Sequence, residues 1–200
     1  MTETDPYAPL HGILRRLDTL LERRGLTRED VVDPDELSAA TGLATTEIRT
    51  LLRGGRPRER TLGEFVPRRV NFLYKRLLAA SGRRPADIVG EVAAALNATS
   101  VWARSLLQGD KLPNVPHLTA LAEYFRVPVT FFTDSAPVAL ARELRPIVSR
   151  LEEPDPLATL MERFGIQRVH ARTDGPITPS QKAAIAAFLE VVLSREGSQR

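Results

Sequence analysis

The segment PADIVGEVAAALNATSVWARSLLQGDKLPNVPHLTALAEYFRVPVTFF, residues 85–132, decides the fold of this chain. Its apolar residues recur every three or four positions, which is the spacing of amphipathic helices. Proline, asparagine and glycine separate the apolar groups, as expected at helix ends. The spacing predicts four short helices, over residues 85–96, 100–108, 115–125 and 129–132.

The second of these helices has the most informative pattern. Thr99 is placed to cap its N-terminus, and Gly109 ends it. Its inward residues are Ala103, Leu106 and Leu107, and its outward residues are Ser100, Val101, Arg104, Ser105 and Gln108. Two short helices joined by a tight turn, the second with a small polar outer face, form a helix-turn-helix, whose second helix fits the major groove of DNA. The alternative is a helical hairpin that only packs.

The order Thr99, Ala103, Leu106, Gly109, followed by the apolar run over 118–127, resembles the XRE/Cro/phage-repressor family of helix-turn-helix regulators. Two further runs, 125–134 and the helix that starts FVPRRVNFL at Phe65, are similar to the EspR-type regulators within it. This resemblance covers about residues 65–197. It implies an all-α, lambda-repressor-like DNA-binding domain and a C-terminal region that forms a homodimer.

Residues 36–54 repeat the pattern of residues 91–109 at an offset of 55, with seven of nineteen residues identical. We interpret this as an internal repeat, and so as a second helix-turn-helix unit, although chance similarity between Ala/Leu-rich helices is the alternative. After Gly54 there is no room for the last two helices of the family. The first unit is therefore truncated, and we expect it to pack on a helix over 66–80. Whether it contacts DNA or serves as an arm or packing module stays open.

The residues expected to bind DNA fall into three groups. Those facing base edges are Ser100, Val101, Trp102 and Ser105. Those holding phosphates or the groove wall are Arg104, Gln108 and Lys111. Residues 53–69 contain six arginines and two glutamates and form a basic joint between the two units. The third group lies in this joint and consists of Arg56, Arg58 and Arg60. The joint is alternatively a solvated linker.

The C-terminal third is predicted to be helical. We expect Pro146 to kink or interrupt a helix over 137–151, and a further helix over 157–172. Thr178-Pro-Ser-Gln181 has the form of a capping box and starts a helix that runs to Arg195. Its apolar stripe is expected to form the dimer interface: Ile185, Phe188, Leu189, Val192 and Leu193. The alternative is that this stripe docks on the rest of the monomer.

Composition excludes several classes of function. The chain has no cysteine and a net charge of +3. Of its 28 basic residues, 25 are arginines. Arginine suits contacts with phosphate and guanine, but codon bias in a GC-rich genome would produce the same excess. The N-terminus MTETDPY has no signal-peptide core, and no apolar run approaches a membrane span. The three histidines, His11, His117 and His170, lack metal-ligand spacing, and no nucleotide-binding or hydrolase motif is present. We expect no enzyme activity, no cofactor and no metal, and no effector pocket is marked.

The sequence therefore predicts an all-α, cytoplasmic, nucleoid-associated DNA-binding regulator that acts as a homodimer on double-stranded DNA. Its expected domains are a truncated helix-turn-helix-like unit (1–62), an XRE-type helix-turn-helix domain (63–134) and a helical dimerisation region (135–200). The alternative is a protein–protein adaptor that binds another regulator or RNA polymerase and uses its helix-turn-helix folds for packing. A ligand sensor or enzyme in the C-terminal third is a third, weaker alternative.

Overall fold

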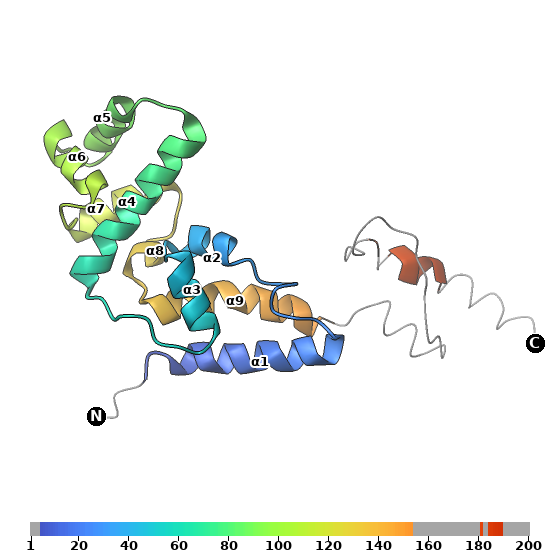
Figure 1. The fold of residues 1–200 in the computed structure, drawn as a ribbon. Coiled ribbons are helices and arrows are strands. Elements are labelled where there is room, and N and C mark those ends of the chain that lie inside the picture. Colours follow the sequence, from blue (N-terminus) through green and yellow to red (C-terminus); the bar gives the residue numbers. More distant parts are fainter. Residues whose placement is uncertain (1–4, 154–180, 182–183, 190–200) are drawn as a thin grey trace, which may run out of the picture. The chain divides into compact units, whose positions relative to one another are not determined.

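A computed structural model describes residues 5–153, 181 and 184–189 of the 200-residue chain. Contacts divide the chain into two compact units, Met1–Val148 and Ser149–Arg200. The labelled helices (Figure 1) are α1 Ala8–Arg24, α2 Pro34–Thr41, α3 Thr45–Leu52, α4 Leu62–Ser81, α5 Pro85–Ala95, α6 Ser100–Gln108, α7 Val115–Phe125, α8 Thr130–Thr133 and α9 Ala136–Glu152. The described ranges contain no strand, so the all-α prediction is confirmed there.

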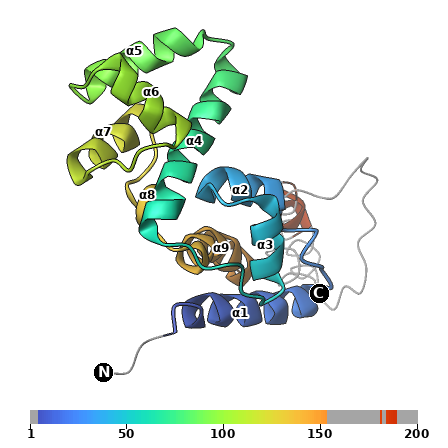
Figure 2. The same ribbon diagram turned by 60° about the vertical axis from the view of Figure 1, so that its left-hand side comes forward.

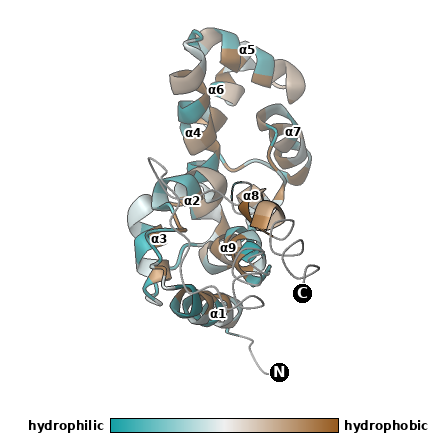
Figure 3. Cartoon of the chain, turned by 90° about the vertical axis from the view of Figure 1, so that its right-hand side faces the viewer, coloured by the Kyte–Doolittle hydropathy of each residue, from teal (hydrophilic) through white to brown (hydrophobic). Residues whose placement is uncertain are grey.

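Helices α4 to α8 enclose one hydrophobic core. α4 packs on α6 and α8, and α5 packs on α6 and α7 (Figure 2). Each helix contributes fully buried residues, among them Val70, Ile88, Leu106, Leu121 and Phe132. Figure 3 shows α8 as one of the most hydrophobic helices, and both of its phenylalanines are buried. This core fixes the position of α6, the helix expected to read DNA.

Helices α1, α3 and α9 lie together in all three views (Figures 1–3). Their buried residues include Leu10, Leu14 and Leu17 of α1, Ile48 and Leu51 of α3, and Leu140 and Leu144 of α9. Arg28, after α1, donates from Nη1 to the carbonyl of Leu52 at the end of α3. The same guanidinium pairs with Asp18 of α1 at 2.6 Å, so it ties these two helices together.

Helix α2 contacts α4 through a hydrogen bond and through the close packing at its C-terminal end. Arg76 of α4 donates to the carbonyl of Ala39 at 2.8 Å. A Cβ added to Gly42, just after α2, would lie 2.8 Å from Cζ of Phe131 and 3.0 Å from Cγ of Arg69. A residue without a side chain is therefore required where the end of α2 meets α4 and α8.

The two repeated segments have matching backbone turns. Gly42 and Asn97 occupy equivalent positions at the offset of 55, and both adopt left-handed conformations, with φ of 68° and 47°. Gly54 and Gly109 are also equivalent and left-handed, with φ of 77° and 85°. The helix between each pair buries the same two leucine positions. The sequence repeat thus corresponds to a repeat in backbone conformation.

Two expectations need correction. The helix expected over 66–80 begins at Leu62, because Thr61 and Glu64 form a capping box at the start of α4 itself. Pro146 does not interrupt α9, which is continuous from Ala136 to Glu152. Most of α9 belongs to the first compact unit, to whose core it contributes buried residues.

The structure describes three of the five residues predicted to form the dimer interface, Ile185, Phe188 and Leu189. Residues 184–189 are helical, with Phe188 68% exposed and Ile185 and Leu189 partly buried. Val192 and Leu193, and the helix predicted over 157–172, lie outside the described residues. Across the described part of the chain, no helix has both the length and the apolar character needed to cross a bilayer.

Candidate nucleic-acid interface

Helix α6 has one buried side and one open side. Ala103, Leu106 and Leu107 are fully buried, as predicted. The exposed side consists of Ser100, Val101, Arg104 and Gln108, and Val101 is 75% exposed. A valine this exposed makes little contribution to the core, so it is available to an external surface.

Both ends of α6 are held by specific contacts. Thr99 is the N-cap, and its hydroxyl accepts a hydrogen bond from the amide of Trp102 at 3.3 Å. At the other end, the side-chain amide of Asn71 in α4 donates to the carbonyl of Leu107 at 2.9 Å. A Cβ at Gly109 would lie 3.2 Å from the carbonyl oxygen of Pro67. α4 therefore contacts the C-terminal end of α6 through both a hydrogen bond and close backbone packing.

Trp102 does not lie on the open side of α6. Its ring lies 4.6 Å from the ring of His117, between centroids, and it packs against the hydrophobic core. Ser105 is also only half exposed. Two of the four residues expected to face base edges, Ser100 and Val101, are thus exposed, whereas Trp102 joins α6 to α7. No local sequence pattern indicates this pairing, because Trp102 and His117 lie fifteen positions apart on different helices.

Unpaired positive charge lies at the C-terminal side of α6. Arg104 and Lys111 are exposed, and within the described residues neither forms an ion pair. Arg84, ahead of α5, is exposed but bound by Asp87 at 2.9 Å. Arg104 and Lys111 therefore remain the cations of this region that are available to phosphates.

A polar cluster joins α5 to α7. Glu91 of α5 accepts hydrogen bonds from the guanidinium of Arg83 and from the hydroxyl of Tyr124 in α7, the latter at 2.8 Å. The bond from Arg83 is the main cause of a lowered pKa of Glu91, and the bond from Tyr124 adds to it. Burial, followed by the hydrogen bond to Glu91, raises the pKa of Tyr124 to about 12. The cluster stabilises the helices that flank α6.

Three arginines of the basic joint, Arg56, Arg58 and Arg60, form ion pairs within the chain. Arg56 pairs with Asp5 at 2.9 Å and lies over the ring of Tyr7, and Arg58 pairs with Glu64 at 3.3 Å. Arg60 pairs with Glu47 of α3, and its side chain is 24% exposed. The joint is thus attached to the segment just before α1, to α3 and to α4, and the structure does not bring these arginines onto the open side of α6.

Comparison with protein-family models, curated proteins and solved structures finds no match to this chain.

Proposed function

We propose that this protein is a sequence-specific DNA-binding transcriptional regulator or nucleoid-associated protein, with α5 and α6 as its helix-turn-helix and α6 as the helix that enters the major groove. The observation that carries the proposal is the open side of α6, on which Ser100, Val101, Arg104 and Gln108 are exposed while the opposite side is buried. An α-helix fits the major groove, and its first residues reach the base edges.

The exposed residues of α6 have the chemistry that such a role requires. Ser100, at the first position of the helix, can exchange hydrogen bonds with a base, and Val101 can contact a thymine methyl group. Arg104 and Lys111 supply charge for phosphates on the side of the helix C-terminus. The left-handed residue between α5 and α6 and the capped start of α6 favour a helix-turn-helix over a random helical hairpin.

The homodimer belongs to the same proposal. Phe188 is 68% exposed in the helical segment over 184–189, and a second copy of the chain would cover it. Sedimentation equilibrium tests the dimer.

One observation favours the adaptor as a second candidate. Three large apolar side chains are exposed on α6 and in the segment that follows it: Val101 at 75%, Leu112 at 51% and Val115 at 74%. Exposed apolar residues of this kind also suit a protein partner. Gel retardation of genomic fragments at two salt concentrations separates the candidates, because an adaptor would retard DNA at neither.

Two substitutions test the assigned contacts on the best-bound fragment. Ser100→Ala should weaken binding to that fragment by about 1 kcal/mol if the hydroxyl contacts a base. Lys111→Ala should weaken binding to all fragments alike and reduce the slope of log K against log salt by about one. Wild-type binding and salt dependence in both variants would show that the assignment of these residues is wrong.

A further inference from the structure

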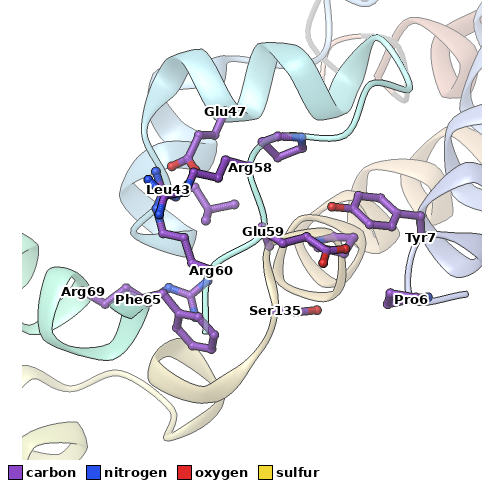
Figure 4. A pocket seen from close by; sticks show the side chains of 13 residues that line it. Pro6, Tyr7, Leu43, Glu47, Arg58, Glu59, Arg60, Phe65, Arg69 and Ser135 are labelled. Atoms are coloured by element: carbon purple, nitrogen blue, oxygen red, sulfur yellow. Dashed lines mark hydrogen bonds and ion pairs between the residues drawn. The ribbon is translucent and has the colours of Figure 1, made fainter. Parts of the chain in front are cut away.

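A cavity of about 280 Å³ lies between the N-terminal end of α1, the segment before α4, α4 itself and the start of α9. Its apolar wall includes Tyr7, Leu43, Phe65 and Pro137. Figure 4 shows Tyr7 on one side of it and Phe65 and Arg69 on the opposite side. The lining also carries the charged side chains of Glu47, Arg58, Glu59, Arg60 and Arg69. A cavity of this size, with aromatic walls and charged groups at its edges, suits a small polar ligand.

Arg69 is a buried cation in the wall of this cavity. It is 2% exposed, and its Nη1 donates to the carbonyl oxygen of Asp134 at 2.6 Å. Its Nε is buried and has no hydrogen-bond partner. Desolvation lowers the pKa of this guanidinium to about 10. A carbonyl dipole only partly compensates a buried charge, which in proteins is normally paired with an anion.

The nearby carboxylates are already bound by other arginines. Asp134 pairs through its side chain with Arg142, and Glu47 pairs with Arg60. Arg69 therefore has no carboxylate of its own among the described residues, although it lies near both pairs. The guanidinium faces the ring of Phe65, 4.9 Å from the centroid, so an aromatic surface adjoins the charge.

The opposite side of the cavity carries a different polar pair. Tyr7 is 3% exposed and lines the cavity, and its hydroxyl points toward the cavity in Figure 4. Burial, followed by the charge of Glu59, raises the pKa of this hydroxyl. Figure 4 places Glu59 near Tyr7, across the cavity from Arg69. A second negative charge on a ligand would be repelled by Glu59, so one anionic group is favoured, at the Arg69 end.

We propose that this cavity binds a small organic monocarboxylate with a flat apolar body. The carboxylate accepts hydrogen bonds from Arg69 and neutralises its charge. The body lies between Phe65 and Tyr7, and the Tyr7 hydroxyl is available to a polar substituent at the far end. With a volume of about 280 Å³, the cavity has room for a molecule the size of benzoate or phenylacetate.

The same helix links the cavity to α6. Phe65 and Arg69 of α4 line the cavity, while Pro67 and Asn71, on the same turns, contact the C-terminal end of α6. If α6 binds DNA, as proposed above, a ligand that shifts α4 will change the DNA affinity, and DNA will change the ligand affinity by the same factor.

The test is an NMR titration of the full-length wild-type protein, without DNA, using benzoate and phenylacetate as probes and benzyl alcohol as a neutral analogue. We expect saturable shifts of amide signals around Phe65 and Arg69 with at least one carboxylate, and at least about 10-fold weaker binding of benzyl alcohol. No saturable binding of either carboxylate up to about 10 mM, or equal binding of the alcohol, would overturn the proposal.

Arg69→Met and Arg68→Met form a matched pair on α4, because Arg68 is exposed and does not line this cavity. Arg69→Met should lower carboxylate affinity at least about 10-fold without lowering the unfolding temperature, since an incompletely paired buried charge is removed. Arg68→Met should bind as wild type. Equal affinity in both variants would overturn the assignment of Arg69, and the alcohol comparison decides the matter if Arg69→Met does not fold. Since none of these measurements uses DNA, their failure is distinct from a failure of α6 to bind DNA.

Discussion

Adjacent residues at the start of α6 have separate tasks. The hydroxyl of Thr99 accepts a hydrogen bond from the backbone amide of Trp102 and so caps the helix. The side chain of Ser100, in contrast, is exposed. The sequence pattern predicted the cap correctly, because an N-cap depends on local residue types. It could not place Trp102, whose position depends on His117 in another helix.

This division of tasks predicts different consequences for two neighbouring substitutions. Thr99→Ala should lower the free energy of unfolding by about 1 kcal/mol, because one amide at the start of α6 loses its partner. Ser100→Ala is the control and should leave the free energy of unfolding within about 0.5 kcal/mol of wild type. Urea denaturation of the two variants gives both values. Equal losses would contradict the assignment of the cap.

Glycines in the left-handed conformation also differ in what surrounds them. Gly42→Ala should lower the free energy of unfolding by roughly 2–4 kcal/mol, since the new methyl group adds a clash with Phe131 and Arg69 to the strain of positive φ. Gly25→Ala, where φ is 63° and no atom lies within 4 Å of the new Cβ, isolates the strain and should cost about 1 kcal/mol. Urea denaturation that gives the same loss for both would contradict the packing of α2 on α4 and α8.

At the scale of elements, α4 connects the parts of the first unit. Its sides contact α2, α6 and α8, and it lines the cavity beside α1. Thr61 and Glu64 form the capping box that starts α4 at Leu62, four residues before the start that the sequence predicted. The helix then continues through Pro67 to Ser81.

The contact between α5 and α7 gives a pH-dependent prediction. Tyr124→Phe should lower the free energy of unfolding by about 1 kcal/mol near neutral pH, because the hydrogen bond to Glu91 is lost. Since the folded-state pKa of Tyr124 is raised to about 12, the contribution of its hydroxyl is complete below 10 and is lost as the pH rises from 10 through 12.

Because the pKa of Glu91 is lowered, the contribution of that carboxylate is lost as the pH falls below its usual value of 4.5. The difference between wild type and Tyr124→Phe in urea denaturation should therefore be largest between these limits. A difference that stays constant from neutral pH to about 11 would contradict the hydrogen bond to Glu91 as its cause.

At the scale of the whole molecule, features set by neighbouring residues could be predicted from the sequence, whereas contacts between distant residues could not. The all-α class, the ends of α6 and α7 and the buried side of α6 follow from local patterns, and the structure agrees with these predictions over the described residues. Contacts between distant residues do not follow from local patterns. Arg56 pairs with Asp5, 51 positions away, and Arg69 donates to Asp134, 65 positions away. The ion-pair partners of the basic joint and the cavity therefore became clear only from the structure.

The central claim concerns the open side of α6, and fluorescence anisotropy with labelled genomic DNA fragments at two salt concentrations tests it most directly. The comparison is between wild type, Val101→Glu and Ala8→Glu, since both substituted residues are exposed and α1 lies at the far end of the first unit from α6 (Figure 1). If α6 enters the major groove, wild type and Ala8→Glu bind alike, and Val101→Glu binds at least about 10-fold more weakly at the lower salt concentration, because its carboxylate faces phosphates and base edges. Equal DNA affinity of all three folded proteins, or the absence of binding by wild type at both salt concentrations, would contradict the account.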